Sequence, residues 1–200
     1  MKIFYISLFV ILLGYTTELQ SQERETSSSG ILLSKKSSAG ITYSFGSADL
    51  FADSDIIGGP TYIGRGFNRI GLWLVRDLGS NTDIHFTASY TDNRFTINPA
   101  PIGTPVASRP GNVKFYGVSV YVRYHFFKYL FAGTGPILGI SSGERDISGI
   151  GAGAVLGGEY TFNNGIVISF GPNVSVQGLL PVKSYKLINS GVSFSIGYKL

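Results

Sequence analysis

The C-terminal sequence "GVSFSIGYKL" (residues 191–200) alternates between large apolar side chains and small or polar ones. Val192, Phe194, Ile196, Tyr198 and Leu200 share one parity, and serine, glycine and lysine occupy the other. Successive side chains of a β-strand point to opposite faces, so this pattern predicts a strand with one apolar face. A last strand that pairs on both sides has no free edge, which favours a sheet closed into a barrel.

The same period of two recurs upstream over lengths of about ten residues, the length with which a tilted strand crosses a membrane. Segments 41–46, 84–90, 115–126, 150–160 and 166–171 show it clearly, and 69–78 and 129–140 show it less clearly. The short connections "LGSN", "FFKY" and "FNNG" alternate with "SSGERDIS" and with loops expected at 47–68, 92–113 and 177–188. Outer-membrane barrels show this asymmetry between periplasmic turns and extracellular loops. We therefore expect an all-β fold over residues 38–200, an eight-stranded antiparallel up-and-down transmembrane β-barrel.

The polar face of these strands separates a membrane barrel from a soluble, lipocalin-like ligand-binding barrel, which would alternate in the same way. Here that face is mainly glycine and serine, which suits the narrow interior of an eight-stranded barrel. Charged residues are only 14% of the chain, against roughly 25% in soluble domains. Aromatic residues also gather near the expected periplasmic turns, as in an interfacial girdle: Tyr124, Phe126, Phe127, Tyr129, Tyr160, Phe162 and Tyr198. We therefore predict a location in the cell outer membrane.

Two prolines lie inside expected strands, Pro136 in "TGP" and Pro172 in "FGP". Proline has no N–H to donate to a strand ladder. A closed barrel has no free edge strand to hold it, so we expect a bulge or a local gap at each proline.

The N-terminal segment resembles an export signal. Lys2 precedes an apolar run from Ile3 to Leu13, which is shorter than the roughly 20 residues that a membrane-spanning helix needs. We expect a signal peptide over 1–22 and a periplasmic arm over 23–37. The chain has no cysteine, which excludes disulfides and thiolate metal sites. The net charge of +4 shows no dense basic run, so we expect no nucleic-acid partner.

The chain resembles the small outer-membrane β-barrel proteins of Bacteroidetes, which are grouped as PorT-like or outer membrane protein beta-barrel domain proteins. The resemblance lies in the signal with its glutamine-rich end, the eight expected strands, the segment "FFKYLFAGTGPILG" and the terminal "GVSFSIGYKL". The resemblance covers residues 38–200 as a general pattern. It implies a Gram-negative outer-membrane barrel whose last strand is read by the barrel-assembly machinery. The chain departs from the commonest form by ending in Leu200 instead of phenylalanine. A role in secretion is not carried over from a likeness of fold.

The residues that could carry chemistry do not form a convincing site. The two histidines, His85 and His125, both fall near expected periplasmic turns, and we interpret them as polar residues filling the interior. Ser89 shares a face with His85, but serine is common on that face. The acidic stretch at 47–55 lacks the ligand spacing of a calcium loop. We expect no catalytic residue, no metal, no cofactor and no enzymatic activity.

Three charged residues, Arg123, Glu159 and Lys199, point inward by parity near the periplasmic strand ends. A carboxylate in a narrow lumen is costly unless it is paired. We therefore predict an interior charge network of structural role, in which Glu159 pairs with Arg123 or Lys199.

The sequence thus predicts a monomeric, non-enzymatic barrel with a structural or interaction role, through its extracellular loops or through a periplasmic partner. Expected partners are outer-membrane lipid, lipopolysaccharide and, during biogenesis, the assembly machinery. The alternatives are a narrow, porin-like channel for small solutes and the soluble ligand-binding barrel.

Overall fold

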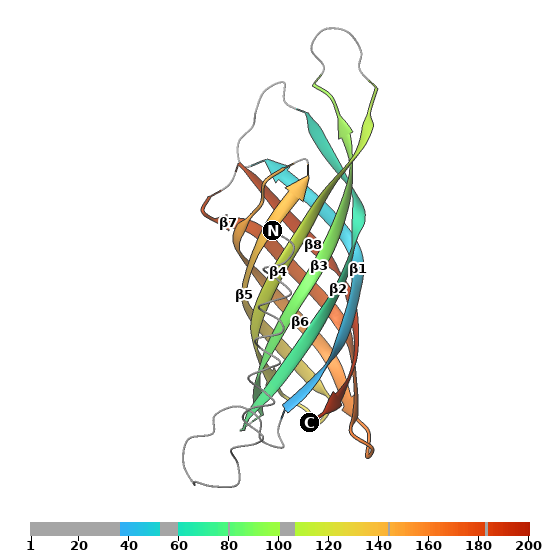
Figure 1. Ribbon diagram of the computed structural model, residues 1–200, viewed down its shortest axis with the longest axis vertical. Helices are drawn as coiled ribbons and strands as arrows, with labels where there is room; N and C mark the ends of the chain where they lie inside the picture. The colour runs from blue at the N-terminus through green and yellow to red at the C-terminus, as the bar shows by residue number, and fades with distance from the viewer. Residues whose placement is uncertain (1–36, 53–59, 80, 101–106, 144, 183) are drawn as a thin grey trace, which may run out of the picture. The chain divides into compact units, whose positions relative to one another are not determined.

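The described part of the chain is built from strands (Figure 1). The computed structural model describes residues 37–52, 60–79, 81–100, 107–143, 145–182 and 184–200. The strands are β1 (Ser37–Ala52), β2 (Thr61–Gly79), β3 (Thr82–Asn98), β4 (Arg109–His125), β5 (Leu130–Gly143), β6 (Gly149–Thr161), β7 (Ile166–Leu180) and β8 (Tyr185–Lys199). No helix among the described residues is long and apolar enough to cross a membrane. The segment 1–22 and most of the arm 23–37 lie outside the described residues.

The eight strands form a closed barrel in sequence order, each antiparallel to its neighbours. The last strand, β8, pairs with β7 and with β1, and Ile196 lies opposite both Ile168 and Ile41. The backbone N–H of Leu200 donates to the carbonyl of Ser37 at 2.8 Å. The barrel expected from the sequence is therefore confirmed, including the pairing of the final strand on both sides.

The barrel has two distinct ends (Figure 1). The turn end holds the β2–β3, β4–β5 and β6–β7 connections, the start of β1 and the C-terminus; the loop end holds the other four connections. Along most of the strands the large apolar side chains face outward and the small polar ones face inward. Leu156 and Phe170 are 50% and 58% exposed on the outside, whereas Ser119 and Ser195 are buried inside. A soluble ligand-binding barrel would show the reverse arrangement.

Three of the expected loops are largely strand, which corrects the sequence prediction. The expected loop 47–68 contains the end of β1 and the start of β2, and the loops at 92–113 and 177–188 are shortened in the same way. The strands are 13 to 19 residues long, longer than a membrane crossing of about 9–11 residues requires. Near the loop end many outward residues are polar, among them Arg65, Arg94 and Lys114, so the signal of a lipid-facing strand weakens although pairing continues.

Both prolines lie at a local gap in a strand ladder. The β4–β5 ladder keeps its register but has no pairs between Ser119↔Ile137 and Val122↔Thr134, beside Pro136. The β6–β7 ladder likewise has no pairs between Val155↔Asn173 and Gly158↔Phe170, beside Pro172. The missing N–H group thus falls where no ladder bond is made, and the expectation of a bulge or a gap is met by a gap.

Candidate functional site

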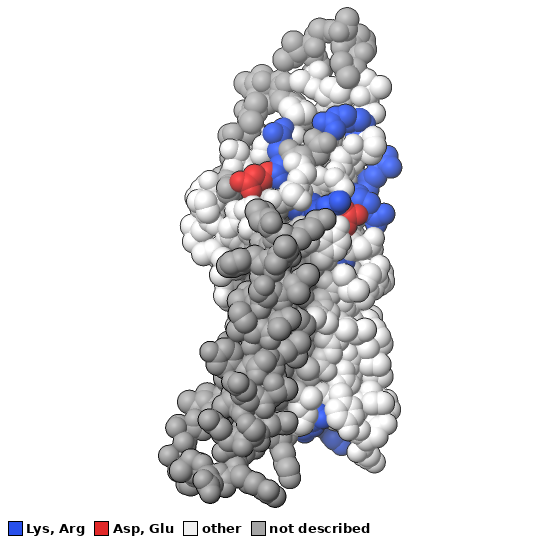
Figure 2. Space-filling view, viewed as in Figure 1, with Lys and Arg blue, Asp and Glu red and all other residues white. Residues whose placement is uncertain are grey.

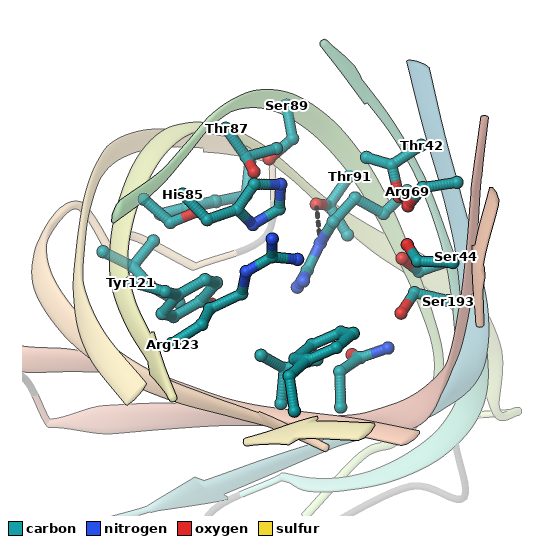
Figure 3. Close-up of a pocket in the computed structure, with 18 of the residues that line it drawn as sticks. Thr42, Ser44, Arg69, His85, Thr87, Ser89, Thr91, Tyr121, Arg123 and Ser193 are labelled. Carbon is teal, nitrogen blue, oxygen red and sulfur yellow. Dashed lines mark hydrogen bonds between the residues drawn. The ribbon is translucent and has the colours of Figure 1, made fainter. Parts of the chain in front are cut away.

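The interior of the barrel contains three layers of side chains. An ion cluster and a small apolar group lie near the turn end, hydroxyl and amide residues occupy the middle, and a large apolar cluster fills the loop end. A cavity of about 70 Å³ lies in the middle layer, and Figure 3 shows the polar side chains that point into it. The lumen is therefore the first place to look for a site.

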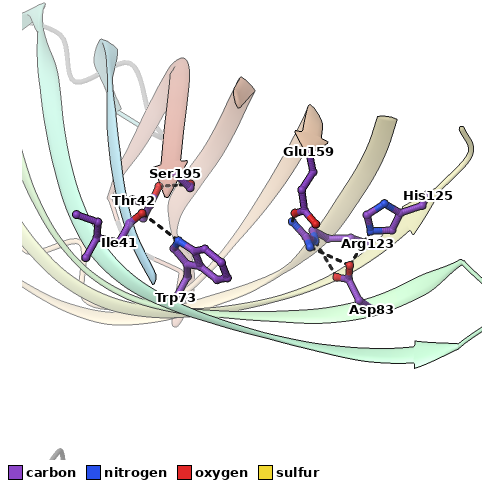
Figure 4. A network of polar contacts seen from close by, with 8 residues as sticks. All are labelled: Ile41, Thr42, Trp73, Asp83, Arg123, His125, Glu159 and Ser195. Atoms are coloured by element: carbon purple, nitrogen blue, oxygen red, sulfur yellow. Dashed lines mark hydrogen bonds and ion pairs between the residues drawn. The ribbon is translucent and has the colours of Figure 1, made fainter. Parts of the chain in front are cut away.

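Arg123 on β4 is the centre of the ion cluster (Figure 4). Its Nε donates to Asp83 Oδ1 at 2.7 Å, and its Nη2 donates to Asp83 Oδ2 at 2.8 Å. Both residues are buried, and they lie directly opposite each other in the β3–β4 ladder. Such a two-pronged pair fixes the plane of the guanidinium as well as neutralising its charge.

Glu159 joins the cluster from β6, on the far side of β5. The Arg123 Nη1 donates to Glu159 Oε2 at 3.0 Å. The side chain crosses β5 at Gly133, where an added Cβ would lie 2.8 Å from Arg123 Cγ. The structure therefore brings together two of the three charged residues singled out in the sequence, and a glycine makes room for the contact.

Lys199 does not join this cluster, contrary to the expected network. It is exposed and makes no ion pair with a described carboxylate. Glu159 pairs with Ser169 on β7, which in turn pairs with Ser195 on β8. Lys199 lies four residues beyond Ser195, further toward the turn end. Its parity predicts the inner face, but Lys199 is the last residue of β8 and its side chain is exposed at the turn end.

Two members of the cluster were not identified as such from the sequence. These are Asp83, the main partner of Arg123, and His125, whose Nε2 lies 2.6 Å from Asp83 Oδ2. Parity does place Asp83 on the inner face. Its partner could not be inferred, because the long β3–β4 connection does not fix the register between these strands.

The structure does not bring the histidines together with a nucleophile. His85 lines the cavity beside Trp73, with ring centroids 5.8 Å apart, and Ser89 lines the same cavity. No hydrogen bond joins His85 to Ser89 in the described part of the chain. Within those same residues, no group of three or more His, Cys, Asp or Glu could hold a metal ion. Asp49 lies in β1, while Asp53 and Asp55 of the acidic stretch lie outside the described residues.

Arg69 on β2 is a second inward arginine, and it belongs to the middle layer. Its Nε donates to Thr91 Oγ1 at 3.0 Å and its Nη2 donates to Ser175 Oγ at 3.1 Å. No described carboxylate forms an ion pair with it. Arg69 was not among the predicted site residues, although it shares the parity of the inward Trp73.

The apolar cluster fills the interior at the loop end. Its buried members are Ala48, Leu50, Phe67, Phe95, Val113, Phe115, Ile137, Ile147 and Leu187. Tyr62, Tyr121 and Tyr185 pack against it, and the Arg145 guanidinium lies 4.4 Å from the centroid of the Tyr185 ring. At the turn end, Trp73, Val75 and Val167 form a smaller apolar group. Side chains therefore fill the lumen on both sides of the cavity.

Comparison with known proteins identifies relatives by structure only. No known family profile matches the chain, and no curated protein sequence matches it. The outer-membrane protein OprG of Pseudomonas aeruginosa is similar in structure, with 11% identity and a TM-score of 0.53, over 82% of this chain and 94% of OprG. The outer-membrane protein AlkL (14% identity, TM-score 0.48) matches over 88% of this chain and 96% of its own. Ail of Yersinia pestis, in complex with the heparin analogue sucrose octasulfate (14%, 0.46), matches over 82% and 98%.

The fold is that of the small eight-stranded outer-membrane barrels. Its outer face carries the apolar belt that such a barrel turns toward lipid, including Leu156, Phe170 and Ile196. Aromatic rings close the belt at the turn end, where Tyr129 and Tyr160 lie 5.6 Å apart. The chain has the fold and the apolar outer belt of an outer-membrane β-barrel protein.

Proposed function

We propose that this barrel is non-enzymatic and acts through the surface that its strands present beyond the membrane at the loop end. The apolar cluster inside that end carries the proposal. It gives the protruding strands a packed core of their own, so they form a rigid platform instead of mobile loops. A channel is the weaker alternative, because side chains fill the lumen above and below the cavity.

Basic side chains on the outside of this platform favour phosphate-bearing outer-leaflet lipid, lipopolysaccharide, as the partner. Figure 2 shows Lys and Arg gathered over the upper part of the barrel, above a broad uncharged band. Arg65, Arg94 and Lys114 are exposed on neighbouring strands. Asp92, opposite Lys114 in the ladder, reduces but does not cancel this positive charge.

The height of these residues fits the phosphate level of the outer leaflet. The tilted rings of Tyr90 and Tyr116 pack on the outer face with centroids 5.1 Å apart, and tyrosine is enriched at membrane interfaces. Arg94 follows Tyr90 by four residues on β3, which places it roughly 10 Å higher for a strand tilted about 40°. Arginine and lysine at that height meet phosphate groups.

The test compares bilayer nanodiscs that contain lipid A with nanodiscs that contain its dephosphorylated form. We expect native mass spectrometry to show phosphorylated lipid A retained on the wild-type barrel, and several-fold less on Arg94→Gln/Lys114→Gln. The control Lys128→Gln/Lys199→Gln removes the same charge from exposed positions at the turn end and should retain the lipid. Equal retention of both lipids, or equal loss in both variants, would contradict the proposal.

The channel alternative has its own measurement, conductance of the refolded barrel in planar bilayers. We expect no stepwise currents beyond those of the protein-free bilayer. Discrete channel openings whose conductance changes in Phe95→Ala, a substitution within the apolar cluster, would show that the barrel is a gated pore and would contradict the platform proposal.

We further infer a place among the PorT-like proteins of Bacteroidetes, with export directed by residues 1–22. Support comes from the terminal strand and the export-like N-terminal sequence, together with the fold. A monomer inserted by the barrel-assembly machinery is the corresponding expectation. N-terminal sequencing of the protein purified from outer membranes tests the cleavage after residue 22.

A further inference from the structure

We propose that the lumen holds a small inorganic anion of chloride size, bound by the Arg69 guanidinium in the middle layer. This site is separate from the outer platform and does not depend on the proposed function. The first observation is the difference between the two inward arginines. Arg123 contacts two carboxylates, whereas Arg69 donates hydrogen bonds to the hydroxyls of Thr91 and Ser175 and lies 5.3 Å from the centroid of the Phe67 ring, with no described carboxylate in an ion pair with it.

The carboxylates of the lumen are committed elsewhere. Asp83 is held by both Arg123 and His125, and Glu159 reaches Arg123 from across β5. A charged group inside a barrel surrounded by lipid is costly unless an opposite charge approaches it. Neutral hydroxyls orient the Arg69 guanidinium but do not neutralise it, and a mobile anion would.

The cavity beside Arg69 offers further hydrogen-bond donors. Ser44, Thr87 and Ser89 all line it, and a hydroxyl rotates to donate or to accept as a ligand requires. Figure 3 shows the Arg69 guanidinium pointing into this space, with Ser44 and Ser193 on one side and His85 on the other. These groups come from opposite walls of the barrel, so a ligand between them would be surrounded.

Two amide side chains provide an independent observation. Both polar atoms of the Asn173 amide, and Oε1 of Gln177, are buried without a hydrogen-bond partner in the described structure. Both residues line the cavity, and Gln177 is only 2% exposed. An amide can turn its NH₂ group toward the cavity, because its two ends are nearly identical in shape. Buried amides without a protein partner are uncommon. An anion that accepts from their NH₂ groups and from Arg69, with water donating to the amide oxygen that faces away from it, would satisfy these groups together.

The size of the cavity limits the ligand. A cavity needs roughly 10–15 Å³ to hold one water molecule. The cavity volume of about 70 Å³ therefore admits a chloride or bromide ion with a few waters. The apolar groups on both sides exclude a ligand with a large body. A bulky organic anion such as gluconate should therefore not bind.

The experiment measures the unfolding temperature of the barrel refolded in micelles with sodium chloride, sodium bromide or sodium gluconate at equal ionic strength. Because a ligand bound only by the folded state stabilises it by mass action, chloride and bromide should raise the unfolding temperature by a few degrees relative to gluconate. We expect Arg69→Met to abolish this difference and Lys128→Gln, at an exposed turn, to keep it. Crystals grown with bromide should show an anomalous peak within about 3.5 Å of Arg69.

Several results would overturn the proposal. Equal unfolding temperatures in the three salts would mean that water alone fills the cavity. A halide effect that persists in Arg69→Met would place the ion elsewhere, and a bromide peak found only outside the barrel would do the same. If Arg69→Met does not refold, Asn173→Leu provides the second variant. It keeps the arginine, and it should weaken the halide effect and leave the gluconate value nearly unchanged.

Discussion

The half of the barrel near its turn end and the half near its loop end place their apolar side chains on opposite faces of the same continuous strands. Near the turn end, outward residues such as Leu156 and Phe170 are apolar and inward ones such as Asp83 and Arg123 are polar. Near the loop end, several outward residues such as Arg94 are polar, and the inward ones form the apolar cluster. The strands pass from one arrangement to the other without interruption.

This inversion shows that the surrounding solvent decides which face of a strand is apolar. Lipid favours apolar side chains outside, so the interior must satisfy its polar groups by ion pairs and hydrogen bonds. Water outside the loop end restores the ordinary arrangement, with an apolar interior stabilised by the hydrophobic effect. Each half should therefore respond to a different kind of substitution.

The largest expected effect is loss of the central ion pair. Arg123→Leu leaves Asp83 and Glu159 facing the lumen without their cation, which should cost about 3–5 kcal/mol of unfolding free energy. Urea unfolding in micelles, followed by the gel shift of unheated samples, measures it. The same substitution at Phe95 keeps an apolar side chain in an apolar core and should cost less. Equal losses of unfolding free energy in Arg123→Leu and Phe95→Leu would mean that the polar and apolar layers of the interior do not differ as described.

A charge placed on the outer face separates lipid from water directly. Leu156 and Ile63 are outward, apolar and similarly exposed, 50% and 54%, but they lie in different halves. Leu156→Arg should cost about 2–4 kcal/mol, as for a charge near the bilayer midplane. Ile63→Arg should change stability by less than about 0.5 kcal/mol, as at a water-facing surface. Refolding into lipid bilayers, titrated with urea, compares the two, and similar costs would move the membrane boundary beyond Ile63.

The inversion also explains how much the sequence predicted. Parity, turn lengths and the terminal strand identified the barrel and its eight strands, because those signals are local. The expected loops were too long, because the apolar outer face that marks a strand in the sequence ends at the membrane boundary while the strands continue beyond it. At Phe95 and Val113 the apolar residues continue on the inner face, and that change of parity is the signal that locates the ends of the strands.

The candidate site could be predicted only in part from the sequence, for a related reason. Arg123 and Glu159 were found because buried charges are rare and require partners. Asp83 depended on a register across the long β3–β4 connection, which no local pattern fixes. Arg69 and the unpartnered Asn173 amide become notable only when the walls of the lumen are assembled.

Gly133 tests whether the crossing of Arg123 over β5 requires an absent side chain. A Cβ at Gly133 would lie 2.8 Å from Arg123 Cγ, whereas a Cβ at Gly158 would approach no atom closer than 3.6 Å. Gly133→Ala should therefore cost about 1–3 kcal/mol by overpacking, and Gly158→Ala should be nearly neutral. Thermal unfolding in micelles gives both values. A neutral Gly133→Ala would show that Arg123 reaches Glu159 by another path.

The smallest effects distinguish the two outer members of the predicted charge network. Glu159 contacts Arg123 but is 20% exposed, so Glu159→Ala should cost about 1 kcal/mol, less than a fully buried charged hydrogen bond. Lys199→Ala removes an exposed ammonium with no described ion-pair partner and should stay within about 0.5 kcal/mol of wild type. The double variant should equal the sum of the two, because the residues share no contact. A coupling beyond experimental error would return Lys199 to the network, and an unchanged melting temperature in Glu159→Ala would remove Glu159 from it.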